Sequence, residues 1–162
     1  MEHQMDWQPE QLIGNTRMKL LAGFSEKDRN DFLHIGRVYQ YHLHDTIIRE
    51  QDEDLNLYLV LEGAVSLWRR NIPVTNLQQG DVFNESKIFL PRSNANTVVA
   101  DDETVILKCS RQDVLQFFTR KPERLLKIFV LNIVAILSNK LTSCEDILIQ
   151  RQLDSMPAQE DE

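Results

Sequence analysis

Glycine and cysteine are scarce in this sequence: five of the 162 residues are glycine and two are cysteine. The chain contains no Gly-x-Ser-x-Gly motif and no glycine-rich loop that ends in Lys-Ser or Lys-Thr. These are the familiar signatures of serine hydrolases and of nucleoside triphosphatases. We therefore expect a protein that is not an enzyme, and we assign no catalytic residue.

Positive charge is also in deficit, because 18 lysines and arginines stand against 25 acidic residues, which gives a formal charge of −7. Such a chain lacks the positive field that attracts nucleic acid or an anionic membrane. The opening MEHQMDWQPE has no signal-like character, so we expect a reduced, cytoplasmic protein in which Cys109 and Cys144 are structural thiols. The longest apolar stretch, residues 125–137, is shorter than the roughly 20 residues of a membrane span, so none is expected.

The middle of the chain has the character of β-strands. Between Arg37 and Leu107, short runs rich in Val, Ile, Leu, Tyr and Trp alternate with polar turns. These runs predict seven strands, at residues 37–43, 46–49, 57–61, 64–69, 73–77, 97–100 and 104–108.

Helices are predicted on both sides of this region. Residues 15–22 predict one helix, Ser25 and Ser110 have the positions of helix N-caps, and Pro122 precedes a long final helix. The fold class is therefore α+β, mainly β: a jelly-roll-like β-roll flanked by short N-terminal helices and a long C-terminal dimerisation helix. The predicted division is one domain at 1–153, with N-terminal helices 1–36, β-roll 37–109 and C-terminal helices 110–153, followed by a disordered acidic tail at 154–162.

The final helix is expected to pair with a second copy of the chain. Residues 125–137 include only two polar side chains, so this part needs cover on more than one side. Further along, apolar residues recur at spacings of four, three and four. Both features predict a parallel, two-fold homodimer. The predicted interface residues are Leu126, Val130, Ile133, Leu137, Leu141, Cys144 and Leu148.

Two segments, in this order, carry a resemblance to a known family. Residues 47–52 followed by Asn56-Leu57-Tyr58-Leu59-Val60-Leu61-Glu62-Gly63, and then Gly80-Asp81-Val82-Phe83-Asn84-Glu85, resemble the motifs of a cyclic-nucleotide-binding domain of the catabolite-activator type. The resemblance covers about residues 32–149. It implies a regulatory or sensor module with no cofactor other than a cyclic nucleotide as effector.

The resemblance also implies where a ligand would bind. Glu85 matches the carboxylate that accepts hydrogen bonds from the ribose, and residues 86–89 match a short helix whose amides face the phosphate. The candidate ligand-binding residues are Phe83, Asn84, Glu85, Ser86, Arg92, Ser93 and Asn94.

Two of these positions depart from the family pattern. Asn84 replaces a glycine, and Asn94 falls where the family has the arginine that pairs with the phosphate, while Arg92 comes two residues early. Losing one charge-assisted hydrogen bond costs about 1.5 to 3 kcal/mol. We therefore expect a degenerate nucleotide site in a module that acts through an unidentified signalling protein. The alternative is a genuine cyclic mono- or dinucleotide-binding protein, with Arg92 as the cation.

Two further expectations concern DNA and metals. Family regulators continue into a helix-turn-helix domain, whereas 13 mainly polar residues follow Ile149, so no direct DNA binding is expected. His42-Leu43-His44 with Glu50 resembles the first metal motif of the cupin family, in which both histidines point into the barrel. Because no histidine follows His44 to complete such a site, we assign no metal ligand.

Overall fold

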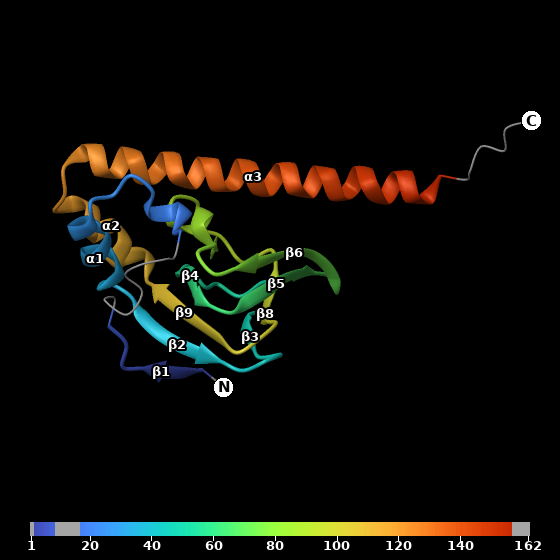
Figure 1. Ribbon diagram of the computed structural model, residues 1–162, viewed down its shortest axis with the longest axis horizontal. Helices are drawn as coiled ribbons and strands as arrows, with labels where there is room; N and C mark the ends of the chain where they lie inside the picture. Colours follow the sequence, from blue (N-terminus) through green and yellow to red (C-terminus); the bar gives the residue numbers. More distant parts are fainter. Residues whose placement is uncertain (1, 9–16, 157–162) are drawn as a thin grey trace, which may run out of the picture.

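The computed structural model describes residues 2–8 and 17–156, and within these residues nine strands form two antiparallel sheets (Figure 1). The first sheet has the order β1 (His3–Met5), β2 (Arg37–Tyr41), β9 (Thr104–Cys109), β4 (Leu57–Glu62) and β7 (Val82–Phe83). The second has the order β3 (Thr46–Ile48), β8 (Thr97–Ala100), β5 (Ala64–Arg69) and β6 (Ile72–Gln78). The mainly β, jelly-roll-like fold class is therefore confirmed.

All seven predicted strands are present, with ends that differ by at most two residues. The sequence pattern missed β1 and β7 because strands of three and two residues are too short to show an alternation of apolar and polar side chains. β1 adds an edge to the first sheet by pairing with β2. β7 pairs with β4 and leads directly into the segment that carries the family resemblance.

Strand β4 shows why the roll has two cores. Its five apolar residues are all buried, and their side chains alternate between the two faces of the first sheet. Leu57, Leu59 and Leu61 join a core that includes the helices. Tyr58 and Val60 join a second core between the two sheets. An apolar run without polar interruptions is therefore required here, because neither face of the strand meets solvent.

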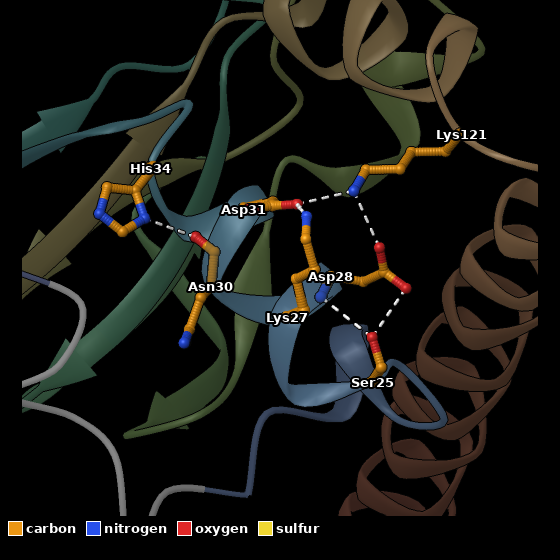
Figure 2. Close-up of polar contacts among 7 residues, drawn as sticks. All are labelled: Ser25, Lys27, Asp28, Asn30, Asp31, His34 and Lys121. Carbon is orange, nitrogen blue, oxygen red and sulfur yellow. Dashed lines mark hydrogen bonds and ion pairs between the residues drawn. The ribbon is translucent and has the colours of Figure 1, made fainter.

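The helices pack against the outer face of the first sheet. α1 (Glu26–Leu33) and α2 (Arg111–Thr119) begin at the predicted N-caps, and both cap hydroxyls accept a backbone hydrogen bond. The ammonium group of Lys121 forms ion pairs with Asp28 and Asp31, each over 2.8 Å, which tie α1 to the segment before the final helix (Figure 2).

The helix predicted at residues 15–22 is wrong in extent. Only η2 (Lys19–Leu21), a single 3-10 turn, forms within the described part of this segment, and residues 15 and 16 lie outside it. A second 3-10 turn, η3 (Glu85–Ile88), replaces the short helix predicted at 86–89.

The final helix, α3 (Glu123–Ser155), is continuous over 33 residues and extends well past the roll (Figure 1). Its buried residues are Leu125, Phe129, Ile133 and Ile136, which recur every three or four residues and place one face of the helix on the roll. The start of the predicted disordered tail at Asp154 is wrong, because Asp154 and Ser155 belong to α3. Residues 157–162 lie outside the described part of the chain.

α3 is long and apolar enough to cross a membrane, since its most apolar 18-residue window has a mean hydropathy of 1.6 and is 22% buried. The expectation that its apolar stretch is too short for a span is therefore wrong as to length. This finding rests on length and composition only, and a core helix of a water-soluble protein meets the same criterion.

Candidate functional site

The turn between β7 and η3 is held by the side chain of Asn84. Its φ of 63° is a left-handed conformation that glycine adopts without strain and that asparagine tolerates better than most residues. The amide of Asn84 donates hydrogen bonds to the backbone carbonyls of Asp54 (3.0 Å) and Asn56 (2.7 Å). The side chain at this position therefore fastens the turn to the loop before β4.

Asn94 makes a similar attachment from the loop before β8. It is 5% exposed, and its side-chain amide donates hydrogen bonds to the carbonyls of Asp52 (2.9 Å) and Asp54 (3.3 Å). Its backbone N–H also donates to Asp52, and its carbonyl accepts from Gln51. Asn94 is therefore engaged with the 51–54 turn through its backbone and its side chain.

A pocket of about 190 Å³ lies between these turns and α3. Ligand pockets usually measure roughly 300 to 1,000 Å³. The residues that line it are Ile48, Leu67, Phe83, Asn84, Glu85, Ser86, Lys87, Asn94, Ala95, Asn96, Val98, Leu137 and Lys140. Five of the seven candidate ligand-binding residues are among them, whereas Arg92 and Ser93 are not, and Arg92 is exposed.

Lys87 is a pocket residue that sequence reasoning missed. It is 6% exposed, and its ammonium group donates a hydrogen bond to the carbonyl of Ser93 over 2.7 Å. Burial, and then the charge of Arg92, lower the pKa of Lys87 below its usual value. One indication in the sequence was the position of this lysine inside the predicted short helix. The direction of its side chain, however, depends on the 3-10 turn that forms there.

Lys140 is the second missed residue, and it enters the pocket from α3. Its ammonium group lies 2.6 Å from a carboxylate oxygen of Glu85 and 2.7 Å from the carbonyl of Val82. The Glu85 side chain is 4% exposed, so the ion pair neutralises a carboxylate that is almost completely removed from water. The carboxylate predicted to face a ribose thus faces a lysine of the same chain.

This site lies on a fold that other proteins share. The cyclic nucleotide-binding domain family matches residues 38–121, which are 84 of the 162 residues. The chain belongs to this family. No curated protein matches it in sequence.

Solved structures of similar fold agree with the family. The catabolite activator protein of Thermus thermophilus is 23% identical, with a TM-score of 0.69 over 83% of this chain and 63% of that one. A cyclic nucleotide-binding domain from Methylobacillus flagellatus KT is 14% identical, with a TM-score of 0.75 over 89% of this chain and 85% of that one. The c-di-GMP responsive global regulator CLP of Xanthomonas campestris is 16% identical, with a TM-score of 0.68 over 75% and 62%. The chain thus spans less than two thirds of the Thermus thermophilus protein, and these likenesses show the fold.

Within the described residues, one stripe of α3 is left uncovered by the rest of the chain. Val134, Leu137, Leu141 and Leu148 are exposed on the helix, and Val130 and Cys144 continue the same stripe as half-buried residues. The spacing alternates between four and three residues, which is the pattern typical of a coiled-coil seam.

Not all of the predicted interface residues lie on that stripe. Ile133 is 3% exposed and packs in the core of its own roll, so its assignment to a dimer interface is wrong. Leu126 is half-buried and packs against the same core. The orientation of α3 on the roll decides that both residues face the core while Val134 is exposed.

The cupin-like alternative finds no support in the site. His42 and His44 are exposed at the turn after β2 and do not point into the roll. In residues 2–8 and 17–156, no group of three or more His, Cys, Asp or Glu side chains is placed to hold a metal ion.

Proposed function

We propose that this chain is a cytoplasmic, homodimeric regulatory module that acts through another signalling protein and does not bind cyclic nucleotides in the manner of its family. The decisive observation is the use of Asn84 and Asn94. Both side-chain amides donate hydrogen bonds to backbone carbonyls of the 52–56 loop. In the family pattern, glycine stands at the position of Asn84 and a phosphate-binding arginine at the position of Asn94.

The energetic argument follows from these contacts. Asn94 is neutral, buried and engaged with the 51–54 turn, so the pocket lacks the charge-assisted bond that this position supplies in the family. Such a bond is worth about 1.5 to 3 kcal/mol, or roughly one to two powers of ten in affinity. The pocket, which Leu137 and Lys140 of α3 help to line, measures about 190 Å³ and is smaller than most ligand pockets, which also opposes binding.

Dimer formation supplies the second half of the proposal. The exposed stripe begins at Val134, where Ile136 and Lys140 still hold α3 on the roll, and it continues to Leu148 on the far side of that attachment. Past the roll, α3 runs free of the other described elements (Figure 1). A second α3 in parallel orientation would bury this stripe around a two-fold axis. The resulting dimer offers a partner protein a composite surface that carries a net negative charge from each copy, which favours a protein over duplex DNA.

Titration calorimetry tests the ligand half directly. With cyclic AMP, cyclic GMP and cyclic di-GMP, we expect no binding at micromolar concentration. Micromolar affinity for any of them would overturn the proposal.

A second candidate, a genuine cyclic-nucleotide sensor, is favoured by one observation. Lys87 places a buried ammonium group beside the 93–96 loop, where an anionic phosphate could replace the carbonyl of Ser93 as its partner. In that case Lys87→Met abolishes the micromolar binding, whereas Arg92→Ala, a matched loss of positive charge outside the pocket, leaves it unchanged. Loss of binding in Arg92→Ala would instead identify Arg92 as the cation that pairs with the phosphate.

A further inference from the structure

The contact between Lys140 and Glu85 joins the ligand pocket to the dimerisation helix. Glu85 belongs to η3 and Lys140 to α3, and the two are 55 residues apart in the chain. Ile136 is the last buried residue of α3. Beyond it, Lys140 attaches the helix to the roll through Glu85 and the carbonyl of Val82 in β7.

The carboxylate of Glu85 needs a partner because a buried, unpaired charge is strongly unfavourable. Its side chain is 4% exposed, so solvent cannot satisfy it. In the ligand-bound form that the family resemblance implies, ribose hydroxyls would donate to this carboxylate. Lys140 satisfies the same group from within the chain, and its side chain occupies part of the pocket wall next to Leu137.

Resting on the proposed function of this pocket, we propose that Lys140 is a tethered substitute for the ligand. Its ammonium group holds Glu85 and keeps α3 on the roll, so a molecule that binds at Glu85 must displace Lys140. Occupation of the pocket and attachment of α3 beyond Ile136 are then linked equilibria, because each requires the same carboxylate.

The position of Lys140 on the helix gives this exchange a mechanical consequence. Leu137 and Leu141 of the exposed stripe lie one turn before and one residue after Lys140. Release of Lys140 therefore frees the part of α3 that carries the end of the stripe, from Leu141 onward, while the buried residues up to Ile136 keep the start of the helix on the core.

Four variants and a defined probe test the proposal. The probe is cyclic AMP at up to millimolar concentration, followed by nuclear magnetic resonance titration of the full chain. Lys140→Met leaves the Glu85 carboxylate without its ammonium partner, so a ribose hydroxyl can donate a hydrogen bond to it. The apparent affinity for cyclic AMP should then rise at least about tenfold over wild type. Lys127→Met removes the same charge from an exposed ion pair with Glu123 on the same helix and should bind like wild type. Lys140→Arg, which retains a cation, should also bind like wild type.

The fourth variant identifies Glu85 as the shared group. In Lys140→Met combined with Glu85→Gln, the gain in affinity should disappear. Hydrogen exchange adds a readout of the helix, because amides 137–144 should exchange faster in Lys140→Met than in Lys127→Met. Equal affinity for cyclic AMP in the Lys140→Met and Lys127→Met proteins would overturn the proposal.

The two proposals fail separately. Micromolar binding of cyclic AMP by the wild-type protein contradicts the proposed function. The ratio of affinities between Lys140→Met and wild type tests the role of Lys140 at whatever affinity the wild type has.

Discussion

Asn84 and Asn94 donate side-chain hydrogen bonds to the same backbone carbonyl, that of Asp54, over 3.0 and 3.3 Å. One comes from the turn before η3 and the other from the loop before β8. The two departures from the family motif therefore act together, since both stabilise the loop before β4. Substitutions at the two positions should not be additive, because they share an acceptor.

Replacement of Asn94 by alanine should destabilise the protein by about 1 to 3 kcal/mol. The change removes two part-buried side-chain hydrogen bonds and leaves the carbonyls of Asp52 and Asp54 with fewer partners. Urea unfolding followed by circular dichroism measures the effect. Asn96→Ala, at a half-buried residue of the same pocket, should change the free energy of unfolding by less than about 0.5 kcal/mol. Equal effects of the two substitutions would show that the Asn94 bonds do not stabilise the fold.

Two substitutions of Asn84 separate its hydrogen bonds from its backbone conformation. Asn84→Gly and Asn84→Ala lose the same donors to Asp54 and Asn56, but only alanine is strained at a φ of 63°. We expect the alanine variant to be less stable than the glycine variant by about 1 to 2 kcal/mol. Thermal and urea unfolding of the pair provide the measurement, and identical stabilities would contradict the left-handed turn.

The exposed stripe of α3 predicts opposite outcomes at two adjacent residues. Val134→Asp places a charge where the partner helix would pack, so it should yield a folded monomer. Ile133→Asp buries a charge in the roll's own core and should cost about 3 kcal/mol or more in stability. Light scattering gives the mass and circular dichroism the folded fraction. A wild-type protein that is monomeric at micromolar concentration would refute the dimer.

The ion pairs of Lys121 predict a pH dependence of stability (Figure 2). Hydrogen bonds from Lys121, and then from Lys27, lower the pKa of Asp31 from 3.8 to about 2. Because the pKa of Asp31 is lower in the folded state, the ionised carboxylate stabilises the fold. This contribution is complete at pH values above the unfolded pKa of 3.8 and is lost as the pH falls through about 2.

Lys121→Met tests this directly. At neutral pH it should lower the free energy of unfolding by about 0.5 to 1 kcal/mol, because the two carboxylates are partly exposed to solvent. The difference from wild type should shrink between pH 4 and pH 2. Lys127→Met, whose ion pair with Glu123 is exposed, should show a smaller effect at every pH. A difference that stays constant down to pH 2 would exclude the aspartates as its source.

Much of the fold was predictable because its signals are local. The strands from Arg37 to Cys109 show as short apolar runs between polar turns, and Ser25 and Ser110 mark two helix starts by the hydroxyl that accepts a backbone N–H. The motif around Glu85 lies on a turn that lines a pocket, as the segment-level prediction requires, while the binding of a ligand there stays a prediction. Each of these signals is contained in a window of a few residues, so the tertiary structure did not have to be known.

Tertiary packing decided what the pocket contains and what α3 exposes. Ile133 and Val134 are adjacent apolar residues. Only the orientation of α3 on the roll buries Ile133 and exposes Val134. Lys140 reaches Glu85 across 55 residues of sequence, whereas Arg92, seven residues from Glu85, stays outside the lining. Local sequence determines which side chains each element presents, because propensity and periodicity act over one or two turns. Their partners depend on the relative placement of whole elements, which is set by how the two cores are filled.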